Sequence, residues 1–239
     1  MGLWNAGGWI WVVMWGAPAF AVSGEPAQTE VKIGLACEDL GRFQSLKASK
    51  TDHITFFEKP GRPFQRAGVI LRKRAGDHQD VTVKVRPKVP GSPVPPAGPG
   101  VEVEGDWTLK SRTLTWAFKV DGAQFTKEQM TWLAAITSEK PDARSRVELE
   151  SERWKWDQER EEIPGLEGEK VSFERWLRVR SAGGDCLALE VSVRVDSARA
   201  EKAIAALQKF VVSKGVRIVP ALQENKTARV LDLLLGKAR

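Results

Sequence analysis

The sequence is poor in the residue types on which most nucleophilic and zinc-dependent enzymes rely. It has no tyrosine and only two histidines, His53 and His78, and neither has a metal-ligand partner in its local context. No Ser, Cys or His stands out as a nucleophile beside a base, so covalent catalysis is not predicted. A basic run of five residues and any zinc-finger or RNA-binding signature are also missing, although the net charge is +6. We therefore expect an anionic small-molecule partner and no nucleic acid, while the oligomeric state stays undetermined.

Positive charge is absent from the N-terminal segment, because residues 1–31 contain no Lys or Arg. The apolar run from Trp9 to Trp15 is too short to span a bilayer, and it leads to the A-x-A pattern Ala19-Phe20-Ala21. This pattern predicts a signal peptide over residues 1–21 and a linker over residues 22–28. The mature chain is then expected to lack a membrane span and to be exported, either to the periplasm or to the medium. A basic n-region is missing, so a misplaced start codon and an uncleaved anchor stay open as alternatives.

Cysteine occurs only twice, as Cys37 and Cys186. In an oxidising compartment the two side chains could form a disulfide bond. Two separate buried thiols agree equally well with the residues, so both arrangements stay open.

Apolar and charged residues alternate through much of the chain. Val69 to Arg86 predicts two strands around a polar turn, with one aliphatic face and an opposite face that carries Arg72, Arg74, Lys84 and Arg86. Further strand-like segments cover residues 30–35, 54–57, 101–104, 113–120, 146–150, 176–180 and 187–194. These strands could form a sandwich with its charges in water, or a barrel that collects the charges in its lumen.

Helical spacing of apolar residues is found in four segments, at residues 38–46, 125–136, 197–214 and 227–235. The amphipathic helices among them would cover the aliphatic outside of a barrel. Residues 87–100 are rich in proline and glycine and predict a surface loop. In a barrel lumen, Arg and Lys would clamp the oxygens of a polyphosphate, and carboxylates would hold a divalent cation that activates water.

Several short motifs follow one another in a distinctive order between residues 29 and 235. They are Glu30-x-Lys32, Phe56-Phe57-Glu58, Gly68-Val69-x-Leu71-Arg72-x-Arg74, Thr82-Val83-Lys84, Glu102-x-Glu104, Leu187-Ala188-Leu189-Glu190 and Asn225-Lys226-Thr227. This order resembles that of the CYTH superfamily, the triphosphate tunnel metalloenzymes, which include class-four adenylate cyclases, thiamine triphosphatases and inorganic triphosphatases. The chain departs from the family pattern where Gln28 replaces the first glutamate of the ExExK strand, where Glu58 replaces an aspartate, and where Gly100 replaces an arginine.

The resemblance implies an α+β fold over residues 29–236, in which an antiparallel β-barrel forms a tunnel with a charged lumen and is covered by helices outside. It implies phosphate-binding roles for Lys32, Arg72, Arg74, Lys84, Arg86, Arg178, Arg180 and Lys226. It also implies Mg²⁺ or Mn²⁺ held by Glu30, Glu102, Glu104 and Glu190. Glu148 and Glu150 follow Arg146 in a similar pattern and could take the place of Glu102 and Glu104.

The predicted function is a divalent-metal-dependent phosphohydrolase that acts on tripolyphosphate or an organic triphosphate; adenylate cyclase activity is the less favoured reading of the resemblance. Gln28 and the signal-like N-terminus support an alternative, a non-catalytic polyphosphate- or organophosphate-binding domain of the periplasm or cell envelope. A purely structural envelope domain is a third interpretation. If Lys32 pairs across from Glu190 in an antiparallel ladder, Cys37 is expected to lie near Cys186.

Overall fold

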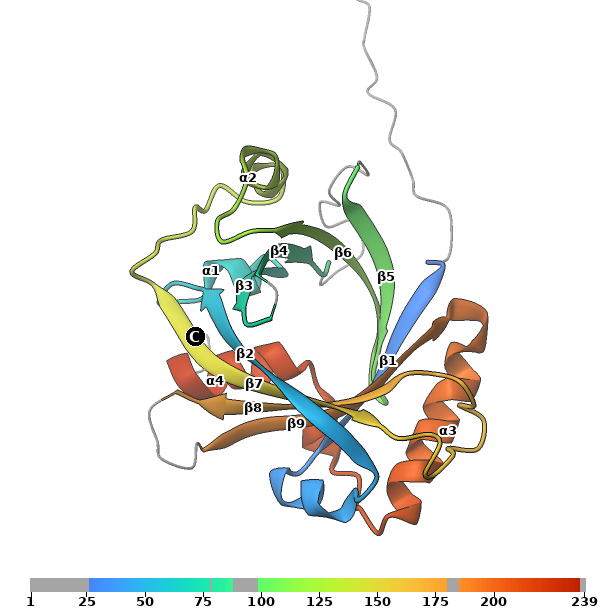
Figure 1. Cartoon of the computed structure of the whole chain (residues 1–239). Coiled ribbons are helices and arrows are strands. Elements are labelled where there is room, and N and C mark those ends of the chain that lie inside the picture. The colour runs from blue at the N-terminus through green and yellow to red at the C-terminus, as the bar shows by residue number, and fades with distance from the viewer. Residues whose placement is uncertain (1–25, 78, 88–98, 180–184, 237–239) are drawn as a thin grey trace, which may run out of the picture.

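Nine strands form one closed barrel in the computed structural model, which describes residues 26–77, 79–87, 99–179 and 185–236. Around the barrel they follow the order β1-β5-β6-β4-β3-β2-β7-β8-β9, and β9 pairs with β1 (Figure 1). The strands are β1 (Gln28–Leu35), β2 (Leu46–Phe57), β3 (Val69–Ala75), β4 (Asp80–Val85), β5 (Val101–Trp107), β6 (Arg112–Asp121), β7 (Arg146–Trp156), β8 (Val171–Arg178) and β9 (Cys186–Asp196). The predicted barrel is confirmed, and the sandwich alternative is wrong.

One pair of neighbouring strands is parallel, which corrects the expectation of an antiparallel barrel throughout. Residues 29–31 of β1 pair in parallel with residues 105–107 of β5, whereas the other neighbours in the barrel are antiparallel. The side chain of Thr29 fills the space beside Gly105, where a Cβ atom would lie 2.4 Å from Thr29 Oγ1. A glycine is therefore needed at the point where the first strand closes the barrel.

Helices lie on the outside of the barrel, as predicted (Figure 1). They are η1 (Cys37–Arg42), α1 (Pro63–Arg66), α2 (Lys127–Ala134), η2 (Ser197–Arg199), α3 (Ala200–Ser213), η3 (Pro220–Gln223) and α4 (Lys226–Leu235), where η marks a 3₁₀-helix. Leu207 of α3 is fully buried in one cluster with Ile33 of β1 and Val191 of β9. Leu133 of α2 is buried in a second cluster with Leu71 of β3. Beside α2 and α3 the aliphatic strand faces thus point outward and leave the polar faces for the interior, whereas Phe56 and Trp176, which share a cluster with α4, face the interior.

The segment before α4 is fixed to β1 by one buried glutamine. Gln223 donates from Nε2 to the carbonyl oxygen of Gly34 at 2.8 Å, and its Oε1 accepts from the Gly34 N–H at 3.2 Å. Val230 and Leu231 of α4 are buried in the same apolar cluster as residues of β2, β7 and β8. These contacts hold Lys226, the first residue of α4, against the barrel.

Several boundaries differ from the sequence prediction. The helix expected at residues 38–46 is only the 3₁₀-helix η1, because β2 already begins at Leu46. Strands β2, β7 and β8 are longer than predicted, since their additional residues carry charged side chains that a hydrophobic pattern does not detect. The predicted signal peptide, most of the loop at 87–100, His78 and Arg180 lie outside the described residues. Within the described part of the chain, no helix combines the length and the apolar character needed to span a bilayer.

Candidate functional site: a charged cavity inside the barrel

A cavity of about 600 Å³ lies inside the barrel, and all nine strands and the start of α4 contribute to its wall. The wall contains eleven cationic and six anionic side chains, and the buried carboxylates of Asp52 and Asp80 pair with four of these cations, which leaves an excess of three positive charges. The cations are Lys32, Lys50, Arg72, Arg74, Lys84, Arg86, Lys119, Arg153, Lys155, Arg194 and Lys226, and the anions are Glu30, Glu102, Glu104, Asp106, Glu174 and Glu190.

Most residues that the sequence singled out line this cavity. The wall includes six of the eight predicted phosphate-binding residues and all four predicted metal ligands. Arg178 does not line it: the register of β8 shifts after Trp176, and Arg178 is exposed at the strand end, 3.8 Å from Asp185. Arg180 lies outside the described residues.

The paired acids that face the cavity are Glu102 and Glu104, which decides between the two pairs left open by the sequence. Leu149 shares an apolar cluster with the wall residue Trp176, and Ser151 donates to Glu174, so this face of β7 points inward and Glu148 and Glu150 lie on the outer face. They therefore do not contribute to the cavity wall.

Several wall residues were missed by the sequence prediction. Asp106 continues the inward face of Glu102 and Glu104, and this spacing of two could have identified it. Arg153 and Glu174 lie in the parts of β7 and β8 that were not predicted as strands. Arg153 and Glu174 were therefore missed because the sequence analysis predicted strands β7 and β8 to be shorter than they are.

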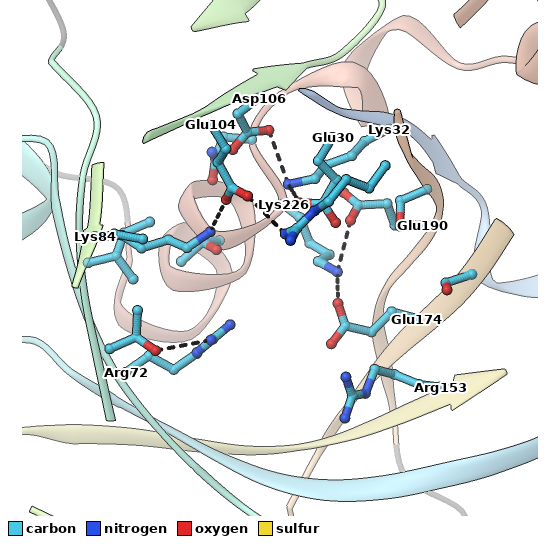
Figure 2. A pocket seen from close by; sticks show the side chains of 18 of the residues that line it. Glu30, Lys32, Arg72, Lys84, Glu104, Asp106, Arg153, Glu174, Glu190 and Lys226 are labelled. Carbon is cyan, nitrogen blue, oxygen red and sulfur yellow. Dashed lines mark hydrogen bonds and ion pairs between the residues drawn. The ribbon is translucent and has the colours of Figure 1, made fainter. Parts of the chain in front are cut away.

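One side of the wall is built from ion pairs around Lys32 (Figure 2). Lys32 Nζ lies 2.8 Å from Glu30 Oε2 and 3.1 Å from Asp106 Oδ1, and Asp106 also pairs with Arg86. Burial opposes the charge of Lys32, yet the nearby carboxylates, Asp106 foremost, raise the pKa of its ammonium group. Burial likewise opposes the charge of Asp106, but Lys32 and Arg86 hold its pKa below the usual range. These groups are ionised together.

Lys226 forms a second centre of ion pairs where α4 meets the cavity. Its ammonium group pairs with Glu174 and lies 3.1 Å from Glu190 Oε1, and it lies 4.4 Å from the ring centroid of Trp176 (Figure 2). Ser151 Oγ donates to Glu174 at 2.7 Å. Burial disfavours charge here too, but Lys226 and then Arg74 hold the pKa of Glu174 below its usual range.

The other side of the wall is a cluster of incompletely paired arginines, which we call the arginine side: Arg72, Arg74 and Arg153. The Nε atoms of these three arginines are buried, and no Nε atom among them has a hydrogen-bond partner. Arg153 and Arg74 share the carboxylate of Asp52, with Arg74 at 3.6 Å, and Arg72 lies 3.6 Å from Asp80 and donates to Thr82 Oγ1 at 3.3 Å. Burial, and then repulsion by Arg74, lowers the pKa of Arg72 to about 10. Buried guanidinium donors without partners are costly unless an anion completes them, so this side is suited to phosphate oxygens.

No family model and no curated protein matches this sequence. Among solved structures, a protein of Hippeastrum matches with a TM-score of 0.52 at 12% identity, over 81% of this chain and 91% of that one. It is described as a candidate adenylyl cyclase with a dominant triphosphatase activity. The chain has the CYTH-like fold. A candidate adenylate cyclase of Bacillus halodurans (TM-score 0.47, 14% identity, 85% of this chain and 98% of that one) is similar as well. So is a protein of Pyrococcus horikoshii (TM-score 0.42, 14% identity, 82% and 96%).

The carboxylates of this CYTH-like chain do not form a ready-made metal site. Within the described ranges, no three His, Cys, Asp or Glu side chains come together so that they could hold a metal ion. Glu104 lies 2.7 Å from Lys84 and 2.8 Å from Arg194. Gln28 donates to Asp196 at 2.8 Å in an exposed position. As arranged, the predicted metal ligands bind basic side chains, and the residues do not fit a preformed divalent site.

Glu58, which follows Phe56 and Phe57 where the family pattern has an aspartate, has a local structural role in this chain. It is 4% exposed and accepts from the backbone N–H groups of Phe64 at 3.3 Å and Gln65 at 2.8 Å. These donors belong to the first turn of α1, whose free N–H groups need acceptors. The carboxylate therefore caps α1 and does not line the cavity.

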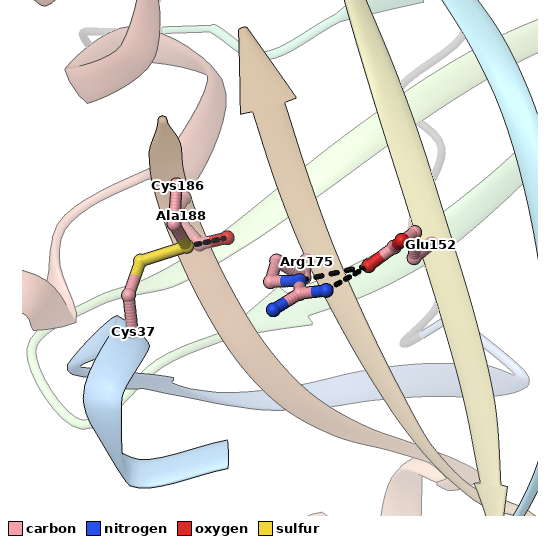
Figure 3. The surroundings of a disulfide bond; sticks show 5 residues. All are labelled: Cys37, Glu152, Arg175, Cys186 and Ala188. Carbon is pink, nitrogen blue, oxygen red and sulfur yellow. Dashed lines mark hydrogen bonds and ion pairs between the residues drawn. A yellow bond between two sulfur atoms is a disulfide. The ribbon is translucent and has the colours of Figure 1, made fainter. Parts of the chain in front are cut away.

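The disulfide between Cys37 and Cys186 is formed, so the alternative of two separate thiols is wrong (Figure 3). It joins η1 to the first residue of β9. The register differs from the expected one by two residues, because Gly34 and not Lys32 is opposite Glu190. Close to the bond, Arg175 pairs with Glu152 through Nε at 2.8 Å (Figure 3).

The depressed carboxylate pKa values predict a loss of stability in acid. A carboxylate whose pKa is lower in the folded state stabilises the fold above its unfolded value of about 4, and this contribution disappears as the pH falls further. Glu174 and Asp106 are such groups. We expect the free energy of unfolding, measured with urea, to fall steeply below about pH 4. Glu174→Gln should flatten this acid slope, while Glu148→Gln, on the outer face, should leave it unchanged; equal slopes in all three proteins would contradict the assignment.

Proposed function

We propose that the cavity binds tripolyphosphate or the triphosphate group of an organic triphosphate. The observation that carries this proposal is the excess of three positive charges that remains when Asp52 and Asp80 are counted with the wall, together with the three Nε donors of the arginine side that lack hydrogen-bond partners. Guanidinium groups bind phosphate oxygens through paired, charge-assisted hydrogen bonds. A chain of three phosphates brings many such oxygens and enough negative charge to compensate the excess.

Thermal unfolding with and without tripolyphosphate tests this proposal. A ligand that binds only the native state stabilises it by about 2.7 kcal/mol at a concentration near one hundred times Kd. For a domain of this size we expect a Tm increase of roughly 5–10 °C. Sulfate at equal ionic strength is the control and should give a much smaller shift. An unchanged Tm, or equal shifts with both anions, would contradict triphosphate binding.

A second candidate function is divalent-metal-dependent hydrolysis of the bound triphosphate. It is supported by the triphosphatase activity described for the Hippeastrum protein, with which this chain shares its fold. Glu102 also favours it, since it is an exposed carboxylate of the wall without an ion pair among the described residues. Phosphate release from tripolyphosphate with Mg²⁺ or Mn²⁺ is the test, and cyclic product with pyrophosphate from ATP would indicate cyclase activity. Binding without either product would identify a non-catalytic module.

We also propose that the chain folds in an oxidising compartment, such as the periplasm. The support is the Cys37–Cys186 disulfide together with the signal-like residues 1–21. Mass spectrometry of alkylated protein from the native host, without reduction, is expected to show both cysteines bonded and a chain that begins after Ala21. Free thiols in an uncleaved chain would overturn this location.

A further inference from the structure

Four of the six carboxylates of the cavity wall lie around two lysine ammonium groups, and Figure 2 shows both ammonium groups pointing into the cavity. Lys32 Nζ lies among Glu30 and Asp106, and Lys226 Nζ lies among Glu174 and Glu190. We propose that Lys32 and Lys226 are built-in counter-ions, which take the place of a divalent metal ion and let the arginine side bind its polyanion without one. The part concerning the polyanion rests on the proposed function, whereas the part concerning the counter-ions does not.

The geometry around Lys226 is the first support. The side chains of Lys226, Glu174 and Glu190 are 8%, 19% and 12% exposed, so water screens their charges only weakly. The carboxylates come from neighbouring strands, because Glu174 is paired with Glu190 between β8 and β9. Two buried carboxylates on neighbouring strands repel each other unless a cation lies between them. The Lys226 ammonium group supplies that cation.

The geometry around Lys32 repeats this arrangement on β1 and β5. Glu30 and Asp106 are directly paired in the parallel ladder, and both reach the Lys32 ammonium group, at 2.8 Å and 3.1 Å. The raised pKa of Lys32 means that the surrounding carboxylates favour its charged form. Gln28 lies two residues before Glu30 on β1. Its side chain is uncharged and donates a hydrogen bond to Asp196. Lys32, together with Arg86, which also pairs with Asp106, thus balances the carboxylates of Glu30 and Asp106 from within the fold.

The arginine side keeps guanidinium donors that the carboxylates Asp52 and Asp80 satisfy only in part. Lys32 and Lys226 are both occupied by carboxylates, whereas the Nε donors of Arg72, Arg74 and Arg153 have no hydrogen-bond partners. A polyanion can therefore bind there through guanidinium groups alone. Removing one internal ammonium group should leave two adjacent buried carboxylates without a cation, which is the oxygen-ligand environment that divalent ions prefer.

Isothermal titration of the full chain with Mn²⁺, without any phosphate present, tests the counter-ion role. Wild-type protein is expected to show no saturable binding, and Lys226→Met should bind Mn²⁺ at least about tenfold more tightly. Lys155→Met is the matched control, because it removes one lysine of the same wall that has no ion pair among the described residues. This control should behave like wild type. Lys32→Met is the second variant if Lys226→Met does not fold, and it should also gain Mn²⁺ affinity.

Two results would overturn the proposal. The first is tight Mn²⁺ binding by the wild type, or no gain in either lysine variant. The second concerns the ligand: tripolyphosphate should bind the wild type equally well, within about twofold, in EDTA and in excess Mg²⁺ once chelation of the free ligand is corrected. An affinity that rises tenfold or more with Mg²⁺ would contradict metal-independent binding. Absence of tripolyphosphate binding under both conditions would contradict only the proposed function, since the Mn²⁺ titrations use no phosphate.

Discussion

Replacing both Arg72 and Arg74 by methionine is expected to lower the affinity for tripolyphosphate by at least about a hundredfold. Each charge-assisted hydrogen bond to a phosphate group contributes about 1.5–3 kcal/mol, so the loss of two guanidinium groups removes roughly 3–6 kcal/mol. The two side chains are adjacent on the inward face of β3, and both have an Nε atom without a hydrogen-bond partner. Isothermal titration of the variant against wild type measures the effect.

The same variant should change the stability of the ligand-free protein only slightly, because relief of the repulsion between Arg72 and Arg74 offsets the loss of their contacts with Asp80, Asp52 and Glu174. The lowered pKa of Arg72 shows that the fold disfavours its charge, by burial first and by repulsion from Arg74 second. Arg178→Met is the matched control, since Arg178 is exposed at the end of β8 and does not line the cavity. Its affinity should stay within about twofold of wild type. Equal losses in both variants would indicate general electrostatic attraction and not a site on the arginine side.

Replacing Cys186 by serine is expected to lower the free energy of unfolding by roughly 3–5 kcal/mol. The disulfide spans 149 residues of sequence, so it restricts the unfolded chain strongly. It also ties η1 to the start of β9, next to the ladder between β9 and β1 that closes the barrel. Urea unfolding of the oxidised wild type and of the variant measures the difference.

Cys37→Ser and the double variant are the controls for this effect. All three substitutions remove the same bond, so their destabilisation should be equal and should not add up. Wild type treated with a reductant should approach the same value. A loss below about 1 kcal/mol in Cys186→Ser would show that the bond contributes little to stability.

The sequence predicted the hairpin from Val69 to Arg86 well, because its alternation of aliphatic and basic residues has the strand period. It predicted β8 poorly. Only residues 176–180 were expected to be a strand, although β8 starts at Val171 and contributes Glu174 to the cavity. Val171 and Phe173 on the outward face alternate with Ser172 and Glu174, but Arg175 interrupts that face before Leu177 and breaks the apolar pattern on which the prediction depends.

By itself, the sequence determined which side chains of each strand share a face, since that follows from the period of two along the backbone. Such a pattern has the same form whether the charged face points to water or into a lumen. Only the tertiary structure decided this, through the pairing of β1 with β5 and β9 that closes the sheet. It also decided that Glu190 meets Lys226 and that Cys37 meets Cys186. These contacts join residues far apart in the chain, and they depend on a register that no local pattern encodes.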